Sequence, residues 1–337
     1  MQAYVLEGSF GIDHLTRRER PLPDPGPGQV RVRIRAASLN ARDAMMVMGV
    51  YNPRQRLPLV PCSDGAGEVS AVGPGVTRFK VGDRVTTAFF QGWVAGAINR
   101  ARGATALGGP LDGTLAEEML ASEEGLVATP AHLSDEEAAT LPCAGVTAWS
   151  ALVRHGHITA GDTVVVQGTG GVSVFALQLA RLHGARVLVT SKSDEKLEKA
   201  KALGAEVLVH YGRTPEWSAA ARAFGGGQGV DHIVEVGGAG TLEQSLRAVR
   251  MGGAIYVIGV LSGVAASVSL VPILMQDVRL QGVLVGPREA FEAMNRAISA
   301  AALRPVLDRV FPFDEAKAAF AHLASGSHFG KVVVRMG

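Results

Sequence analysis

The clearest chemical pattern in the sequence is a glycine-rich run between two apolar segments, Gly168-Thr169-Gly170-Gly171-Val172. The continuous run TVVVQ before it predicts a buried strand, and the spacing after it predicts a helix. Glycines let the backbone turn tightly and approach a pyrophosphate, whose charge a helix N-terminus stabilises. Ser173 stands where the G-x-G-x-x-G motif has its third glycine, and its small side chain still allows close helix–strand packing. The run therefore predicts a dinucleotide-binding loop.

The end of the next predicted strand indicates which dinucleotide is bound. Loops that bind NAD place an acid about 20 residues after the first glycine, where it bonds the ribose 2′-hydroxyl. Here Ser191 and Lys192 occupy that region, and the first acid is Asp194. A hydroxyl and a lysine would bond a 2′-phosphate, so we expect NADP(H), with Lys196 as a further contact. The alternative for Lys196 is a solvated helix start, in which lysines pair with neighbouring glutamates.

These residues need elements that hold them in place. The stretch Gln29–Ser38 alternates Val or Ile with Arg, which predicts a strand with one wet face. Several such short runs, separated by Gly and Pro, predict a small β-barrel in the first third of the chain. From about Ser134, helical patterns alternate with Val- and Ile-rich strands, which predicts a doubly wound parallel sheet. The fold class is therefore α/β, and the mixed β pattern of the tail is expected to complete the first domain.

Composition excludes several classes of function. The chain has 337 residues, enough for two domains, and a formal net charge of +2, too small to indicate nucleic acid or a membrane surface as a partner. Its two cysteines exclude a disulfide framework and a four-cysteine zinc lobe. No signal peptide and no apolar run long enough to span a membrane are apparent, so we expect a soluble cytoplasmic protein.

The order of these parts resembles the medium-chain dehydrogenase/reductase superfamily. The resemblance rests on GAGEVSAVGPGVTRFKVGDRV, LPCAGVTAW, VVVQGTGGVS and GKVVV, and it covers essentially the whole chain. It is closest to the zinc-free quinone oxidoreductase branch, although some relatives are broadly named alcohol dehydrogenases. It implies a GroES-like catalytic domain (1–127 and 288–337), a Rossmann NADP(H)-binding domain (128–287) and a cofactor in the cleft between them. It also implies a homodimer formed through the edge strand near Val283.

The resemblance provides a test for a catalytic metal. Zinc-dependent members hold the ion with a Cys, a His followed by Glu, and a second Cys, leaving one coordination position open. These positions fall on Asn40, on Ser63 with Asp64, and on Cys143, so one of the three ligands is retained. Cys62, Asp64 and Cys143 are chemically possible ligands of a substitute site, but Cys62 is one residue away from the expected position and would point to the opposite face of a strand. We therefore expect no catalytic metal. We expect Cys143 to be a small buried residue and not a nucleophile.

Without a metal, the reaction best served is hydride transfer from NADPH to the β-carbon of an enone or to a quinone. The resemblance places Asn40, Asp43, Tyr51 and Ser63 on segments that face the nicotinamide, with Tyr51 as a hydrogen-bond or proton donor, or only a half-buried loop aromatic. Asp43 is also expected to hold its loop or to pair with Arg42. The resemblance implies further cofactor contacts at Thr147, Tyr211, Gly259 and Lys331.

Two other functions remain open at this point. The chain is alternatively an NADPH-binding protein with little catalysis, like the lens crystallins derived from this family. It is also compatible with a zinc-free enoyl thioester reductase, for which a basic entrance would bind a CoA phosphate. Arg54 with Arg56, or Arg100 with Arg102 in a long loop rich in Gly and Ala, are candidates for that entrance.

Overall fold

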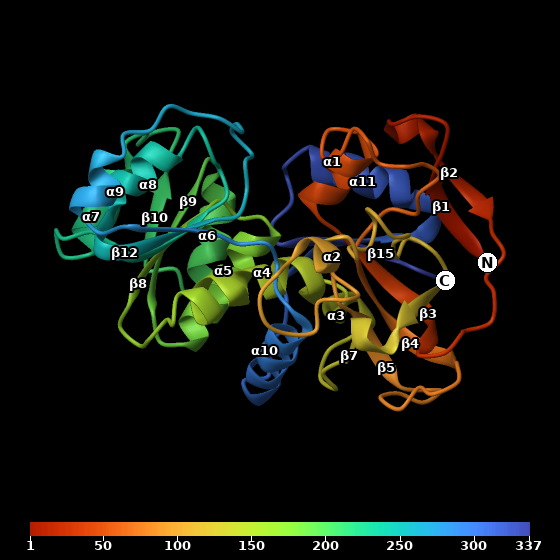
Figure 1. Cartoon of the computed structure of the whole chain (residues 1–337). Coiled ribbons are helices and arrows are strands. Elements are labelled where there is room, and N and C mark those ends of the chain that lie inside the picture. The colour runs from red at the N-terminus through yellow and green to blue at the C-terminus, as the bar shows by residue number, and fades with distance from the viewer. The chain divides into compact units, whose positions relative to one another are not determined.

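The computed structural model describes residues 1–337 and contains two compact units. Unit 1 combines Met1–Val146 with Gly286–Gly337, and unit 2 is the contiguous stretch Thr147–Val285. Figure 1 shows the two units, with the blue C-terminal segment belonging to the unit of the red and orange N-terminal strands. No helix is long and apolar enough to cross a membrane.

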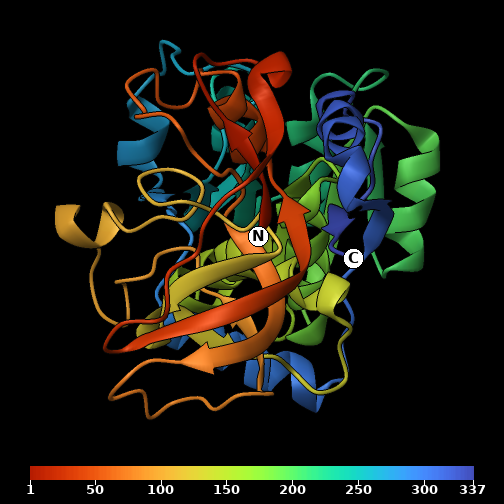
Figure 2. The same ribbon diagram turned by 90° about the vertical axis from the view of Figure 1, so that its right-hand side faces the viewer.

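Unit 1 is built on a seven-stranded sheet of order β14-β15-β3-β4-β5-β7, in which β6 also pairs with β3. Its strands are β3 (Gln29–Leu39), β4 (Asp64–Val72), β5 (Arg84–Thr87), β6 (Glu118–Ser122), β7 (Leu126–Ala128), β14 (Leu307–Pro312) and β15 (Lys331–Arg335). In β3 the apolar residues are buried and the arginines between them are more exposed, so the predicted alternation is confirmed. β15 runs antiparallel to β3, as Figure 2 shows where the blue segment returns to the orange strand.

Short helices and a separate two-stranded sheet surround this sheet. The pair consists of β1 (Gln2–Leu6) and β2 (Leu15–Glu19). The helices are α1 (Ala41–Val47), α2 (Arg100–Gly103), α3 (Asp135–Ala138), α10 (Arg288–Ala300) and α11 (Ala316–Ala324), with a π-helical turn at Leu141–Gly145. Ser134 caps α3 by accepting a hydrogen bond from the Glu137 amide, as its sequence predicts. The buried core joins the sheet to β1 and α11 through side chains such as Leu6, Ile34, Leu126, Phe320 and Val332.

Unit 2 is a six-stranded parallel sheet of order β10-β9-β8-β11-β12-β13. Its strands are β8 (Thr163–Gln167), β9 (Arg186–Ser191), β10 (Val207–His210), β11 (Val230–Glu235), β12 (Val249–Val257) and β13 (Arg279–Gly282). The helices are α5 (Gly171–Leu182), α6 (Asp194–Ala202), α7 (Trp217–Phe224), α8 (Leu242–Ala248) and α9 (Val271–Met275), preceded by α4 (Val146–Trp149) and a π-helical segment Ser150–His155. The strand order reverses beside β8, where doubly wound sheets bind ligands. The predicted α/β class with a Rossmann sheet is confirmed.

One predicted helix is shorter than its sequence pattern indicates. The pattern TLEQSLRAVRMGG predicts a helix through Gly253, but α8 ends at Ala248 and β12 begins at Val249. Gly252 has a φ of +71°, which a right-handed helix excludes, and Val249 pairs with Val230 of β11. Sheet pairing therefore overrides the local helical preference.

Candidate active site

The glycine loop of unit 2 connects β8 to the first turn of α5. Gly168 has a φ of +71°, in the left-handed region that favours glycine, and its amide donates to the carbonyl of Thr190 at 2.8 Å. Gly170 is the N-cap residue of α5, and no side chain caps this end of the helix. The amides of the first turn are therefore free of a side-chain acceptor, which fits the pyrophosphate of a dinucleotide.

The serine at the third position of the motif has a structural role in this loop. The Ser173 hydroxyl, buried in the first turn of α5, donates to the carbonyl of Gln167 at 2.7 Å. This bond joins the helix to the end of β8, which is the close contact that a glycine permits by its small size. Ser173 therefore maintains helix–strand packing by a hydrogen bond.

The residues expected at the ribose end lie on the neighbouring strands β9 and β10. Ser191 ends β9, is buried, and its hydroxyl accepts from the Ser193 amide at 3.2 Å. The Tyr211 amide donates to the Ser191 carbonyl at 3.1 Å, so these two predicted contacts lie side by side. Lys192 is exposed immediately after the strand. The structure thus brings these three residues to one edge of the sheet.

A fourth residue at this edge was not predicted. The guanidinium of Arg213 binds both oxygens of Asp194, at 2.5 and 2.8 Å, and this bond lowers the pKa of Asp194. Arg213 follows Tyr211 by two residues in the segment HYGR, so a basic residue just after a strand end was the available signal. The carboxylate of Asp194, the first acid after β9, is therefore paired with Arg213 of the same unit.

The other predicted cofactor residues occupy different places in the fold. Thr147 is buried in α4, and Lys196 donates its amide to the Ser193 hydroxyl at 3.4 Å in the first turn of α6. Gly259 follows β12, where an added Cβ would lie 2.5 Å from the Val236 carbonyl oxygen. Glycine is therefore required at 259 by packing alone, and contact between these residues and a cofactor stays a prediction.

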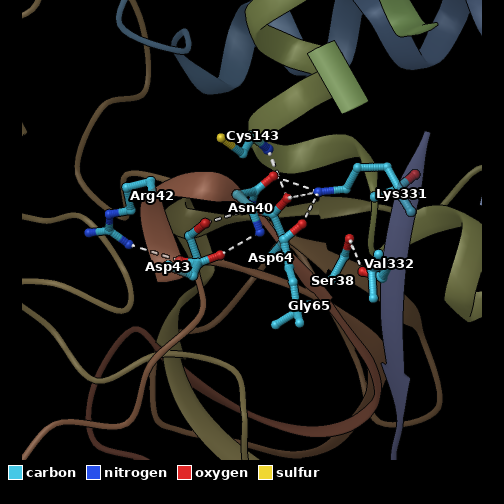
Figure 3. Close-up of polar contacts among 12 residues, drawn as sticks. Ser38, Asn40, Arg42, Asp43, Asp64, Gly65, Cys143, Lys331 and Val332 are labelled. Atoms are coloured by element: carbon cyan, nitrogen blue, oxygen red, sulfur yellow. Dashed lines mark hydrogen bonds and ion pairs between the residues drawn. The ribbon is translucent and has the colours of Figure 1, made fainter. Parts of the chain in front are cut away.

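Unit 1 contains a buried group of polar side chains, the Asp64 cluster, shown in Figure 3. Its members come from four separate segments and are Asn40, Arg42, Asp43, Asp64, Cys143 and Lys331, together with Ser63, which donates to Asp64. Cys143 is half-buried, and not fully buried as expected. Asn40 follows β3, Asp64 begins β4 and Lys331 begins β15, and these three strands are neighbours in the sheet. Strand register therefore assembles residues that are far apart in the sequence.

Lys331 lies at the centre of this cluster. Its side chain is almost fully buried, and its ammonium donates to the Leu39 carbonyl at 2.7 Å and to Asn40 Oδ1 at 2.5 Å. The same nitrogen lies 3.9 Å from Asp64 Oδ2. The ammonium of Lys331 is thus engaged within unit 1, and the cofactor contact expected for this residue stays a prediction.

Asp64 is the second fully buried charge in the cluster. Its Oδ1 accepts from the Ser63 hydroxyl at 2.6 Å, and its Oδ2 accepts from the Cys143 amide at 3.2 Å. Burial raises the pKa of Asp64 to about 6, although the Lys331 ammonium favours the ionised form. The resemblance placed Asp64 beside Ser63 at the position of the metal-site glutamate, but it was not predicted as a catalytic residue.

Asp43 and Arg42 stabilise the N-terminus of α1 by hydrogen bonds. Asp43 is fully buried, its Oδ2 accepts from the Asn40 amide at 2.9 Å, and its Oδ1 lies 3.4 Å from Arg42 Nη1. Burial raises the pKa of Asp43 and the Arg42 guanidinium opposes that shift. Asp43 therefore holds its loop and pairs with Arg42, one of the roles expected for it.

Tyr51 lies at the exposed side of this group, with 48% of its surface accessible. The Arg42 guanidinium stands 5.4 Å from the centre of the Tyr51 ring and 5.2 Å from that of Phe89. Arg42 also donates to the Leu107 carbonyl at 2.7 Å. Arg42 thus links the Tyr51 loop to the segment after β5 by cation–π contacts, a positioning role that the sequence did not reveal.

The donor groups of this cluster do not fit a zinc ion. Ser63 donates its hydroxyl to Asp64, and burial raises the pKa of the Cys143 thiol well above its ordinary value, which disfavours the thiolate that zinc requires. Two cations, Arg42 and Lys331, already balance the two carboxylates. Nowhere in the chain do three His, Cys, Asp or Glu side chains gather in an arrangement that could hold a metal.

Comparison with known proteins matches both units to described families. Residues 26–131 match the alcohol dehydrogenase GroES-like domain, and residues 171–300 match the zinc-binding dehydrogenase family. Relatives of the chain carry the names alcohol dehydrogenase, quinone oxidoreductase and acryloyl-coenzyme A reductase.

Three of these similarities span most of both chains. A zinc-type alcohol dehydrogenase-like protein of Schizosaccharomyces pombe is 42% identical over 307 residues, which cover 89% of each chain. The crystal structure of an NAD-dependent alcohol dehydrogenase is 35% identical, covers 100% of both chains and has a TM-score of 0.92. A mycobacterial protein complexed with NADPH is 28% identical, covers 99% of both chains and has a TM-score of 0.84.

Proposed function

Because this chain belongs to the medium-chain dehydrogenase/reductase superfamily, we propose that it is a zinc-independent, NADPH-dependent cytoplasmic oxidoreductase that reduces quinones or α,β-unsaturated carbonyls. The observation that carries the proposal is the Asp64 cluster. A carboxamide, a hydroxyl and an ammonium lie around a buried carboxylate there, and the one amide nitrogen without an aligned acceptor, Asn40 Nδ2, suits a carbonyl oxygen and not a metal.

A nicotinamide cofactor held by the glycine loop would supply the hydride, and hydrogen-bond donors of unit 1 would stabilise the negative charge that develops on the substrate oxygen. The Asn40 carboxamide donates a hydrogen bond to that oxygen. The Tyr51 hydroxyl then gives a proton to the reduced substrate and regains one from water, which reaches it because half of the side chain is exposed. Arg42 keeps the Tyr51 ring in place through its cation–π contact.

Tyr51→Phe tests the proton-transfer step. The variant should bind NADPH as wild type does, and its kcat should fall about 10-fold or more on an enal, whose oxygen must be stabilised and protonated. Its kcat on an easily reduced quinone should fall less. Steady-state kinetics on both acceptors measure the difference, and equal rates for variant and wild type would leave Tyr51 as a packing residue only.

The preference for NADPH is supported by the edge of unit 2 that holds Ser191, Lys192 and Arg213. Asp194, which would repel a 2′-phosphate, is paired with Arg213. One solved relative carries NADPH, whereas another is described as NAD-dependent, so the choice depends on this chain's own residues. Consumption of NADPH and NADH, with and without a chelator, across a panel of quinones and enals tests the whole proposal. Activity that needs zinc, or binding of NADPH without turnover as in a crystallin-like protein, would contradict it.

A second candidate is reduction of an enoyl thioester. A relative that covers most of the chain is named acryloyl-coenzyme A reductase. Arg54, Arg56 and Arg100 of unit 1 are exposed and available for a CoA phosphate. Comparison of crotonyl-CoA with crotonaldehyde in the same panel distinguishes the two, since a thioester reductase should prefer the CoA compound by its KM.

We also propose a homodimer formed through β13, which is the edge of its sheet. Large apolar side chains are exposed between Val260 and Leu284, including Leu261, Val264, Leu270 and Leu274, which are 69%, 85%, 73% and 79% accessible. An open edge beside apolar side chains favours pairing with a second copy. Light scattering should give a dimer for wild type and a monomer for Leu280→Lys/Leu284→Lys, whereas a monomeric wild type would contradict this proposal.

A further inference from the structure

The hydrogen bond between Lys331 and Asn40 determines how the Asn40 carboxamide is oriented. A lysine ammonium has three donors and no acceptor, so the atom of Asn40 that faces it must be the oxygen. The observed 2.5 Å contact is to Oδ1. The amide nitrogen Nδ2 must therefore point away from Lys331, and a flipped side chain would bring two donors together.

Lys331 is itself fixed, so it is able to impose this orientation. Its second hydrogen bond is to the Leu39 carbonyl, and Asp64 supplies a nearby negative charge. The register of β15 with β3 pairs Val332 with Leu39, which places Lys331 beside the residue before α1. Figure 3 shows the lysine side chain extending from β15 to the group of Asn40 and Asp64. Lys331, at the start of β15, is thus held by the backbone of β3 and acts on Asn40, the residue that follows β3.

The amide nitrogen of Asn40 has an unused hydrogen-bonding capacity. Asn40 has only 9% of its surface accessible, and its Nδ2 has no acceptor with hydrogen-bond geometry, although the amide lies close enough to Asp64 to favour the ionised carboxylate. Buried donors without an aligned acceptor are rare in folded proteins and need a specific explanation, and a catalytic role is one of the recognised ones. An acceptor oxygen of a substrate would satisfy Nδ2.

We infer that Lys331 is a positioning residue that holds the Asn40 carboxamide with Nδ2 available to a substrate carbonyl oxygen. The inference rests on the proposed reduction of a carbonyl-containing acceptor. As the hydride arrives, negative charge develops on that oxygen, and a fixed donor stabilises it without reorganisation. Lys331 therefore acts on the reaction through Asn40, and not by contact with the cofactor.

The test separates orientation from charge balance. Lys331→Met alone would leave Asp64 buried without its counter-charge and endanger folding. The working variant is therefore Lys331→Met/Asp64→Asn, in which the new amide oxygen accepts from the Cys143 amide and the new amide nitrogen donates to the Ser63 hydroxyl, which is able to rotate and accept. Asp64→Asn alone, which retains Lys331, is the matched control, and Asn40→Ala is added to both backgrounds.

The expected results form a double-mutant cycle, in which kcat for an enal is compared among the variants. The double variant and Asn40→Ala should each lose about 10-fold, the loss expected for one transition-state hydrogen bond, and the triple variant should be no slower than Asn40→Ala. The Asp64→Asn control gives the kcat against which the loss in the double variant is measured, so that an effect of Asp64 itself is not counted as an effect of Lys331. The Kd for NADPH should change by less than about twofold in all variants if Lys331 acts on Asn40 and not on the cofactor.

Three outcomes would overturn the inference. If the losses multiply in the triple variant, Lys331 acts independently of Asn40. If the Kd for NADPH rises when Lys331 is replaced, the residue is a cofactor contact. If wild type is inactive on every acceptor, the proposed function fails, and a crystal structure of the double variant then decides the inference separately: an Asn40 side chain that keeps its orientation without Lys331 contradicts it.

Discussion

The glycine loop of unit 2 and the Asp64 cluster of unit 1 prepare for binding in opposite ways. The loop uses backbone amides within six consecutive residues, and it leaves the first turn of α5 without a side-chain cap. The cluster uses side chains from four segments, and most of their polar atoms are already bonded to one another or to nearby backbone groups. A site made of backbone tolerates changes of side chain but not of shape, whereas a site made of side chains depends on charge and register.

The strongest test of this contrast is a change of shape in the loop. Gly170→Val places a branched side chain where the pyrophosphate must approach, so NADPH affinity should fall by at least about 100-fold. Fluorescence titration measures the affinity, and circular dichroism checks the fold. Gly103→Val in α2 is the control, because a Cβ at Gly103 meets nothing within 4 Å. Tight binding by the Gly170 variant would mean that the loop does not hold the cofactor.

The cluster should instead respond to pH. The pKa of Asp64 is raised to about 6 in the folded protein, against an ordinary value near 4. The folded state therefore binds the extra proton between these values, and the stability that Asp64 contributes is present below about pH 4 and lost as pH rises through 6.

Across that range wild type should lose about 3 kcal/mol of unfolding free energy relative to Asp64→Asn, from two pKa units at 1.36 kcal/mol each. Urea denaturation of both proteins at pH 4 and pH 7.5 measures the difference. A constant difference between them would show that Asp64 ionises normally in the fold.

A smaller effect is expected at the ribose edge of unit 2. Lys192→Glu should weaken NADPH binding by about 1.5–3 kcal/mol, the value of a charge-assisted contact to phosphate, and leave NADH binding nearly unchanged. Parallel fluorescence titrations with both cofactors give the ratio. Lys201→Glu, also exposed but at the far end of α6, is the matched control. Equal affinities for the two cofactors in wild type would remove the basis of the prediction.

The smallest effect is expected at Ser173. Ser173→Ala removes the hydrogen bond to the Gln167 carbonyl and should lower stability by about 1 kcal/mol, while NADPH affinity should not change because the loop keeps its backbone. Thermal unfolding and titration measure the two quantities. A loss of affinity without a loss of stability would place the hydroxyl in the cofactor site.

The difference between the two regions also explains what the sequence predicts. The glycine loop and the alternation of strands and helices are local patterns, so they are visible in consecutive residues. Asn40 and Ser63 became candidates through resemblance, but the contact of Lys331 with Asn40 depends on the pairing of β15 with β3, which no local pattern specifies. Arg213 was missed because its role depends on Asp194 of another element. The end of α8 was misplaced because strand pairing outweighed helical preference there.

The pairing of β15 with β3 has a consequence for how the protein is made. Lys331 leaves the ribosome 292 residues after Leu39, the residue whose carbonyl it binds. All of unit 2, a contiguous stretch, is synthesised in the interval and is free to fold. During that interval the edge of β3 that later pairs with β15 remains unpaired, and such an edge is able to pair with the wrong strand. Translation thus completes the nucleotide-binding unit first, and the site for the acceptor is assembled only when β15 emerges.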